Sequence, residues 1–346
     1  TAPNLYWLKE NNELPTNYPN VHGTTAPEFV VSRLTETRPV SDPTDAVSWG
    51  VYDLNKMNWN YHLIDSLGLD QSLFSNLAES CTPAGTLTKP MAAKLGARAG
   101  ITVSVASGDH QCSFAGTVAD YENTLAINIG TGGQASVYVE NPTPRGWLEL
   151  RPFIQKGYLL AGVGVVGGRT FRNLRDFFNN ASKALAGYEV DPDVLYEKLV
   201  ELAMKVPTGA EGVVVDPLFT GSRSNPRAKA AIREITPGTF TPGHMARALF
   251  EAMASHLADS YREAVKLGAL ERSFLVGSGN GLKLNPVLRE SLNTELRMPV
   301  QLGQHNEEAA IGAALCAAVA DGSFSSMSEA SASFVDFVNP TTTTEA

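Results

Sequence analysis

The sequence contains little cysteine, no basic cluster and no long hydrophobic run. Its 346 residues include three cysteines, Cys81, Cys112 and Cys316, which are widely spaced and form no CxxC pair. This pattern favours a reducing compartment and argues against a disulfide framework or a zinc cluster. No apolar stretch approaches the roughly 18 residues of a membrane-spanning helix, and Thr1–Glu10 lacks the basic, then apolar, order of a secretory signal. A cytoplasmic protein without a membrane partner is expected.

Basic residues are outnumbered by acidic residues, 27 to 36, which gives a formal net charge of −9 at pH 7. Because no run rich in Lys and Arg offsets this charge, nucleic acid is not an expected partner. Hydrophobic residues make up 43% of the chain and charged residues 18%. This composition provides a sizeable core and excludes global disorder. The length favours two lobes.

The sequence changes character along its length. Residues 1–100 are rich in loops, with helical patterns near Leu5–Glu10, Phe29–Leu34 and Tyr61–Leu77. Apolar and glycine-rich segments dominate from residue 101 onward, and the Ser/Thr-rich end, residues 336–346, is predicted to be frayed. We therefore expect three parts, covering residues 1–100, 101–335 and 336–346.

The central part alternates strand, turn and helix patterns. The strand predictions are Ile101–Val105, Leu125–Ile129, Ala135–Val139, Gly157–Val166 and Leu275–Val276. Helices are predicted after Gly168, after Thr241, from about Pro286, and over Glu308–Val319. Hairpins mixed with helices that return to the sheet indicate a mixed α/β lobe.

Three glycine clusters lie at strand ends in this lobe: Gly130–Gly133, Gly167-Gly168 and Gly277–Gly281. Glycine lets the backbone approach a ligand closely, and free N–H groups or a helix N-terminus favour anionic oxygens. Any single cluster is more simply explained as a turn. Three of them in one lobe of an acidic chain favour a bound phosphate ester.

Several common enzyme motifs do not fit the sequence. No GxxxxGK[ST] string occurs, which excludes a P-loop enzyme. Gly277–Gly281 reads GxGxG, with no clear βαβ unit and no acidic residue in the expected place downstream, so this segment does not favour a Rossmann dehydrogenase. GxSxG is absent, and a serine hydrolase therefore has no support.

Asp109 is the strongest candidate for acid–base chemistry. It lies in the polar run Ser107-Gly108-Asp109-His110-Gln111, directly after a predicted strand. A carboxylate in such a turn is placed to accept a proton from a substrate hydroxyl. A helix N-cap or a turn aspartate is an equally good reading of the same residue. His110 either contacts substrate or faces solvent.

Taken in order, these segments resemble the FGGY family of carbohydrate kinases, and within it the kinases of sedoheptulose most closely. The similar segments are Leu5–Asn11, Ser41–Gly50, Asn58–Asn60, Gly108–Gln111, Asn128–Gly132, Gly168–Asp176, His244–Glu251, Gly277–Leu288 and Glu308–Ala314. Asn4 stands where a lysine is usual, and Glu234 replaces a glycine of the family pattern. Kinases of xylulose, ribulose and glycerol share most of these segments.

The resemblance implies an α/β chain with an actin-like (ribonuclease H-like) ATPase fold. Residues 1–100 would be the C-terminal remnant of the N-terminal, sugar-binding lobe, and residues 101–335 the nucleotide-binding lobe. Family members open with a Gly-Thr-rich hairpin that binds phosphates and magnesium, and no such hairpin is found here. The chain, which starts at Thr1, is therefore expected to be an inactive fragment. A missing N-terminal segment or a homo-oligomer would complete it.

The resemblance also implies the activity, the cofactors and the roles of individual residues. The expected reaction is ATP-dependent phosphorylation of a primary hydroxyl of a keto-sugar, with Mg²⁺ and with Asp109 as catalytic base. Sugar contacts fall on His110, Gln111 and Asp109, and no metal ligand is assigned. The nucleotide contacts implied are Gly130, Thr131, Gly132, Gly168, Arg172, Gly279, Asn280 and Asn285.

Two other readings remain open. The chain could be a catalytically silent FGGY-like module that binds or regulates. An actin-like ATPase that acts on no sugar is disfavoured by the family-ordered segments around Asp109 and His244.

Overall fold

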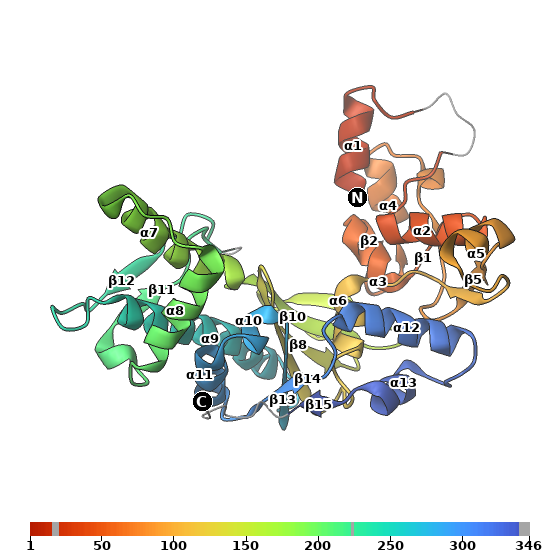
Figure 1. The fold of residues 1–346 in the computed structure, drawn as a ribbon. Helices are drawn as coiled ribbons and strands as arrows, with labels where there is room; N and C mark the ends of the chain where they lie inside the picture. Colours follow the sequence, from red (N-terminus) through yellow and green to blue (C-terminus); the bar gives the residue numbers. More distant parts are fainter. Residues whose placement is uncertain (16–20, 223–224, 339–346) are drawn as a thin grey trace.

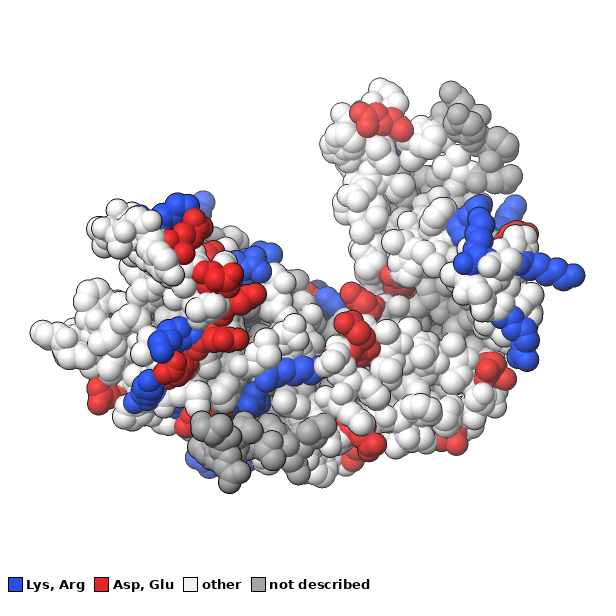
Figure 2. All heavy atoms as spheres, in the orientation of Figure 1, with Lys and Arg blue, Asp and Glu red and all other residues white. Residues whose placement is uncertain are grey.

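The computed structural model describes residues 1–15, 21–222 and 225–338. The chain forms two parts (Figure 1), one built from about the first hundred residues and one built around a seven-stranded sheet. The helices α7 and α8 and the small ribbon β11–β12 extend from the far side of the second part. An open notch separates this extension from the first part on the face seen in Figure 2.

The first part consists of short elements. Its helices are α1 (Ala2–Glu10), α2 (Ala26–Thr35), α3 (Pro43–Ala46), α4 (Tyr61–Ser66) and α5 (Lys89–Leu95), with 3₁₀ turns at Val47–Trp49 and Gln71–Leu73. Its strands form three pairs, β1 (Val40–Ser41) with β4 (Asn76–Leu77), β2 (Tyr52–Asp53) with β3 (Asn58–Trp59), and β5 (Pro83–Thr86) with β6 (Thr102–Ser104). Aromatic side chains hold these elements together, since the rings of Trp49 and Trp59 meet edge to face with centroids 6.1 Å apart.

Two sequence predictions need correction here. The helical pattern over Tyr61–Leu77 is wrong beyond Ser66, because Gly68 has a left-handed backbone (φ 61°) and Asp70 accepts a hydrogen bond from the Ser72 amide, which starts a 3₁₀ turn. The remaining apolar residues belong to that turn and to β4. The predicted strand Ile101–Val105 is present as β6, but it pairs with β5 of the first part. The predicted division at residue 100 therefore falls between two paired strands.

The second part has one mixed sheet in the order β15-β14-β13-β7-β8-β10-β9. The strands are β7 (Thr124–Ile129), β8 (Gly133–Val139), β9 (Glu149–Pro152), β10 (Tyr158–Val165), β13 (Phe274–Ser278), β14 (Val300–Gly303) and β15 (Phe337–Val338). Strands β7, β13 and β14 are parallel, whereas β7, β8, β10 and β9 form an antiparallel run. The four predicted strands from Leu125 to Val276 are all confirmed, and β9, β14 and β15 are additional.

Helices cover both faces of this sheet. They are α6 (Asp109–Ala115), α7 (Gly168–Ala186), α8 (Pro192–Met204), α9 (Pro242–Lys266), α10 (Asn280–Lys283), α11 (Pro286–Leu296), α12 (Glu308–Ala320) and α13 (Met327–Phe334). A 3₁₀ turn (Ala210–Gly212) and the ribbon of β11 (Val214–Asp216) with β12 (Ala231–Arg233) lie between α8 and α9. Thr241 caps α9 as predicted, because its hydroxyl accepts a hydrogen bond from the His244 amide. Among the described residues, no helix combines the length and the apolar character needed to cross a bilayer.

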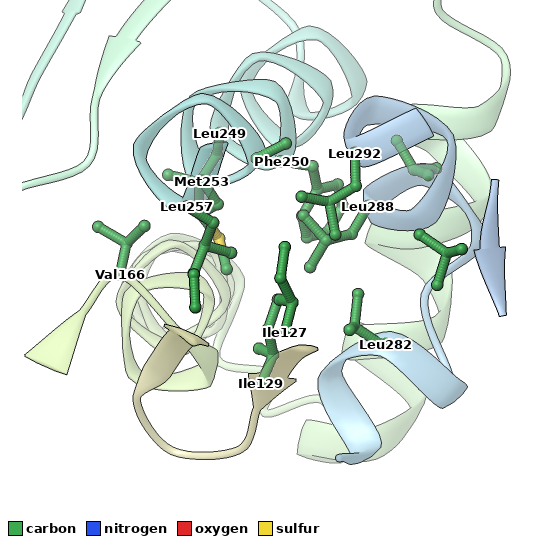
Figure 3. Close-up of a cluster of buried hydrophobic side chains, with 14 of the residues drawn as sticks. Ile127, Ile129, Val166, Leu249, Phe250, Met253, Leu257, Leu282, Leu288 and Leu292 are labelled. Carbon is green, nitrogen blue, oxygen red and sulfur yellow. The ribbon is translucent and has the colours of Figure 1, made fainter. Parts of the chain in front are cut away.

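The two sheet faces bury different residues because side chains alternate along a strand. Ile127 and Ile129 of β7 point toward Leu249 and Phe250 of α9 and toward Leu288 of α11 (Figure 3). On the opposite face, α6, α12 and α13 cover the sheet with a second cluster. That cluster includes the three thiols Cys81, Cys112 and Cys316, which are all buried.

The end of the chain is more ordered than the sequence suggested. Residues 336–346 were predicted to be frayed, yet Phe337 and Val338 form β15 and pair with Gly303 and Leu302 of β14. Backbone pairing with an existing strand satisfies their amide and carbonyl groups. Residues 339–346 lie outside the described part of the chain.

Candidate active site

The glycine clusters, far apart in the sequence, meet at one end of the sheet. The Gly168 amide donates a hydrogen bond to the Gly130 carbonyl at 2.9 Å, and a Cβ on Gly168 would lie 2.6 Å from that oxygen. Gly279 has φ 82°, and a Cβ there would lie 2.5 Å from the Ile129 carbonyl oxygen. Side chains at these positions would separate the turns, so glycine is what permits their close approach.

These turns border a cavity of about 830 Å³, which is within the size range of small-molecule sites. Five of the predicted nucleotide contacts line it, namely Gly130, Thr131, Gly168, Arg172 and Asn280. The other lining residues are Phe171, Arg175, Asp193, Tyr196, Glu197, Val200, Glu201, Met204, Gly281 and Leu284. The first turn of the 19-residue helix α7 opens on the cavity, and a helix N-terminus favours anions.

Charged side chains of both signs surround this cavity. Arg172 and Arg175 face it from α7, and Asp193, Glu197 and Glu201 face it from α8. In Figure 2 the same mixture of charges covers the surface where α7 and α8 lie. The positive charges adjoin the glycine turns because Arg172 lies one helical turn from Gly168.

Three predicted nucleotide contacts are not among the lining residues: Gly132, Gly279 and Asn285. Asn285 is 1% exposed, and its Oδ1 accepts a hydrogen bond from the Leu288 amide at 3.0 Å, which caps α11. Its side chain also lies near the Tyr196 hydroxyl, where it opposes the rise that burial causes in the pKa of that group. Asn285 therefore supports the cavity wall through Tyr196, and a direct contact with adenosine stays a prediction.

Sequence reasoning missed the aromatic wall of the cavity. The rings of Phe171 and Tyr196 meet edge to face with centroids 4.8 Å apart, and Phe171 also packs on Phe250. Burial raises the pKa of the Tyr196 hydroxyl. Tyr196 lies on α8, a helix that the sequence analysis did not predict, although Pro192 after the capping Asp191 is a helix-start signal.

Asp109 is exposed in the first turn of α6, which the preceding Gly108 caps. Its Oδ1 accepts a hydrogen bond from the amide of His110 at 2.7 Å. Asp109 is therefore the first residue of the helix and not its N-cap, so the N-cap alternative is wrong, and the carboxylate is exposed to solvent.

His110 is held in one orientation by two partners. Its Nδ1 lies 3.1 Å from Nη1 of Arg151, and its Nε2 lies 3.0 Å from Oγ of Ser136. Because a guanidinium can only donate, Nδ1 accepts and the ring proton is on Nε2, which donates to Ser136. Burial first, and then the charge of Arg151, lower the pKa of His110 to about 4, against the opposing effect of Asp109. A histidine in this state is neutral near pH 7.

The contact with Ser136 also places Asp109 relative to the glycine turns. Ser136 lies on β8, three residues after Gly133, and three residues of strand span about 10 Å. His110 contacts Ser136 from the first turn of α6. The helix that carries Asp109 is thus connected to the strand that follows the Gly130–Gly133 hairpin.

Arg151 is a second residue that the sequence analysis did not identify. It lies on the edge strand β9, where its Nη2 is 2.5 Å and its Nε 2.9 Å from Oε2 of Glu149. Burial lowers the pKa of Arg151, and the charge of Asp109 acts in the opposite direction. The sequence signal for this ion pair was the Glu-x-Arg spacing, because residues two apart on a strand lie on the same face.

Gln111 is 2% exposed, unlike its neighbour Asp109. Its Nε2 donates hydrogen bonds to the carbonyl oxygens of Pro152 at 3.0 Å and Thr44 at 3.4 Å. These bonds tie α6 to β9 and α3. A sugar contact by Gln111 stays a prediction.

A GxGxxG spacing is present at Gly162–Gly167, just before α7. Its strand, β10, runs antiparallel to both β8 and β9. It therefore forms no βαβ unit, and the strand topology does not support a dinucleotide-binding site at this glycine motif. In the part of the chain that the structure describes, no group of three or more His, Cys, Asp or Glu side chains is arranged to hold a metal ion.

Comparison with known protein families gives two matches that together cover most of the chain. Residues 1–116 match the N-terminal domain, and residues 125–320 the C-terminal domain, of the FGGY family of carbohydrate kinases. The match to the C-terminal domain alone covers more than half of the chain.

Individual relatives have low sequence identity to this chain. Human sedoheptulokinase is 27% identical over 323 residues, which cover 90% of this chain and 65% of that protein. The autoinducer-2 kinase of Escherichia coli K12 is 29% identical, over 83% of this chain and 55% of that protein. The chain thus spans about 65% of the length of the sedoheptulokinases that it matches.

Solved structures share the fold. The xylulose kinase of Lactobacillus acidophilus superposes with a TM-score of 0.80 at 22% identity, over 97% of this chain and 66% of that one. The glycerol kinase of Plasmodium falciparum, solved with ADP, gives 0.78 at 18% identity, over 96% of this chain and 65% of that one. With its mixed α/β fold and matches to both family domains, the chain belongs to the FGGY family of carbohydrate kinases.

Proposed function

We propose that the chain supplies the catalytic base and the nucleotide cleft of an ATP-dependent kinase that phosphorylates a primary hydroxyl of a keto-sugar. The observation that carries the proposal is the meeting of the glycine turns around Gly130 and Gly168 at a cavity, in a chain that also exposes the carboxylate of Asp109 at the start of α6. Sedoheptulose is the first substrate to test because human sedoheptulokinase is among the relatives, and xylulose and ribulose come next.

The proposed domain assignment follows the expected two-lobe division. Residues 1–100, together with the strand β6 that pairs with β5, are the remnant of a sugar-binding lobe. The rest of residues 101–335 is a nucleotide-binding lobe with an actin-like, ribonuclease H-like sheet. The antiparallel run β7-β8-β10 beside the parallel strands β13 and β14 supports this assignment.

The proposed nucleotide site is the 830 Å³ cavity. The phosphates lie against the turns of Gly130, Thr131 and Gly168, where the N-terminus of α7 favours negative charge. The amides of Gly130 and Gly168 already donate to the carbonyls of Gly132 and Gly130, so these two glycines serve by allowing close approach of the backbone. Tyr196 and Asn280, which also line the cavity, would face the adenosine. Mg²⁺ would enter with ATP and neutralise phosphate charge.

In the proposed reaction, the carboxylate of Asp109 accepts the proton of the sugar hydroxyl as its oxygen attacks the γ-phosphorus. The new O–P bond forms while the bond from that phosphorus to the β,γ-bridging oxygen breaks, and ADP leaves with the electron pair. Phosphoryl transfer needs mainly alignment and charge stabilisation. Neutral His110 keeps its proton on Nε2 for Ser136, so it does not compete with Asp109 as a base.

The test measures ADP release with a panel of ketoses, on the protein expressed from its natural reading frame. Asp109→Asn is expected to lower kcat by about 10²–10⁴, the usual contribution of a positioned base. ATP binding, followed by calorimetry, is expected to stay unchanged. Asp65→Asn, at an exposed carboxylate of α4, is the matched control.

Two results would contradict the proposal. Normal turnover of the Asp109→Asn protein would remove the catalytic role of Asp109. ATP binding without phosphoryl transfer to any ketose would instead identify a catalytically silent module.

A further inference from the structure

The helix that carries Asp109 is fixed at its C-terminal end by the lobe it belongs to. A Cβ on Gly312 of α12 would lie 1.9 Å from the carbonyl oxygen of Cys112, and one on Gly116 would lie 2.1 Å from that of Glu308. Helices α6 and α12 therefore pack backbone to backbone. This contact fixes the end of α6 away from Asp109 and leaves the position of its first turn to other residues.

The first turn of α6 is held by α3 of the other part of the chain. The Gly108 amide donates a hydrogen bond to Oγ1 of Thr44 at 2.7 Å, and Ser107 Oγ donates to Oδ2 of Asp42 at 2.9 Å. The Gln111 side chain donates to the Thr44 carbonyl at 3.4 Å. Three bonds thus join Asp42, the N-cap of α3, and Thr44, in its first turn, to residues on either side of Asp109.

Asp42, at the centre of this network, is fully buried. It accepts hydrogen bonds from Thr44 Oγ1 at 2.7 Å, from Ser80 Oγ at 2.5 Å and from the Asp45 amide at 2.9 Å, in addition to that from Ser107. Burial raises the pKa of Asp42, and these donors oppose the rise. Because every partner can donate, the network suits an ionised carboxylate.

The direction of the bonds at Thr44 follows from this arrangement. A hydroxyl has one proton, and Thr44 gives that proton to Asp42. Its oxygen can then accept only, and the Gly108 amide is the donor that it meets. The bonds run in one direction from Gly108 through Thr44 to the buried Asp42 carboxyl, and such chains strengthen each member.

We propose that Thr44, oriented by Asp42, is a positioning residue that fixes the Gly108–Asp109 peptide and so aims the Asp109 carboxylate at the cleft. This inference rests on the proposed role of Asp109 as the base. Thr44 touches no substrate in the proposal and acts only through Gly108. Residues of the first part of the chain then determine the orientation of Asp109, which belongs to the second part.

A purely structural account predicts a different result. Asp42 also caps α3 by accepting from the Asp45 amide, and the other bonds could serve only to hold α3 in place. In that case, deletion of any hydroxyl bonded to Asp42 would have the same consequence. Thr44→Val and Ser80→Ala separate the two accounts, because both remove a donor to Asp42 but only Thr44 accepts from Gly108.

The first measurement is hydrogen exchange of the peptide that contains Gly108, which needs no activity. In Thr44→Val the Gly108 amide loses its acceptor, and its exchange is expected to accelerate about tenfold, the factor of one net hydrogen bond. Ser80→Ala is expected to leave this peptide unchanged, and Thr44→Ser to restore wild-type exchange. Equal exchange in the Thr44→Val and Ser80→Ala proteins would overturn the inference.

The second measurement is steady-state kinetics with ATP and the accepted ketose, on the protein from its natural reading frame. Thr44→Val is expected to lower kcat by up to about 10²-fold, the cost of a misplaced catalytic group, with the KM for ATP unchanged. Ser80→Ala is expected to keep wild-type kcat, and equal losses in the two variants would overturn the inference. If wild-type protein transfers phosphate to no ketose, the proposed function fails, and with it the catalytic part of the inference. The exchange result would still decide whether Thr44 holds Gly108.

Discussion

The neutral state of His110 predicts a specific loss of stability in acid. The histidine has a pKa of about 4 in the folded protein, against its usual 6.5. Between these values the unfolded chain binds a proton that the folded chain does not, so the free energy of unfolding decreases as the pH falls. The contribution of His110 is complete above about pH 6.5 and is lost progressively down to about pH 4.

The magnitude follows from the two pKa values. Between about pH 7.5 and about pH 5, the histidine alone should lower the free energy of unfolding by about 2 kcal/mol. Asp45 changes in the opposite direction over the same range, because burial raises its pKa to about 6 and the folded state takes up its proton first. The pH dependence of the free energy of unfolding of the wild type alone would therefore contain both effects.

A comparison of wild type with His110→Gln isolates the histidine. The glutamine amide can still donate to Ser136 but does not titrate, while Asp45 and the other acids are common to both proteins. Urea unfolding at a series of pH values gives both stabilities. We expect the wild type to lose about 2 kcal/mol more than the variant between about pH 7.5 and about pH 5. Parallel profiles would refute the reasoning, because they would mean that His110 is protonated in the folded protein.

Two glycine substitutions test the packing on which the site depends. Gly168→Ala would bring a Cβ to 2.6 Å from the Gly130 carbonyl oxygen, and we expect calorimetry to show ATP binding at least about tenfold weaker because the phosphate turns separate. Gly312→Ala would place a Cβ 1.9 Å from the Cys112 carbonyl oxygen, and we expect a loss of about 3 kcal/mol in the free energy of unfolding, measured in urea. Gly238→Ala, whose Cβ has no neighbour closer than 3.9 Å, is the control for both, and a control effect of equal size would contradict either expectation.

Local patterns were sufficient to predict the central elements of the large sheet. Alternating and apolar runs identified β7, β8, β10 and β13, and the glycine clusters marked the turns that meet around Gly130, Gly168 and Gly279. The prediction failed where an element is too short to carry a period. Over Tyr61–Leu77 a helix, a 3₁₀ turn and a two-residue strand together imitate one helical pattern.

The residues around Asp109 show a different limit of sequence reasoning. Arg151 and Ser136 lie on β9 and β8, and their contacts with His110 depend on how these strands pack beside α6. No spacing in the sequence encodes that contact. The same is true of Thr44. In the sequence it is one polar residue of Ser41-Asp42-Pro43-Thr44, and only the structure shows that its hydroxyl accepts a hydrogen bond from Gly108.

Both parts of the chain contribute residues that determine the position of the Asp109 carboxylate. The second part packs α12 against α6 and keeps His110 neutral, through burial first and then through the charge of Arg151. The first part supplies Thr44 and its acceptor Asp42, which meet the peptide just before Asp109. If the two parts move when ligands bind, the bonds of Ser107, Gly108 and Gln111 to Asp42 and Thr44 are where that motion reaches the first turn of α6. The 2.7 Å hydrogen bond from the Gly108 amide to Thr44 Oγ1 would then couple closure of the cleft to the orientation of the Asp109 carboxylate.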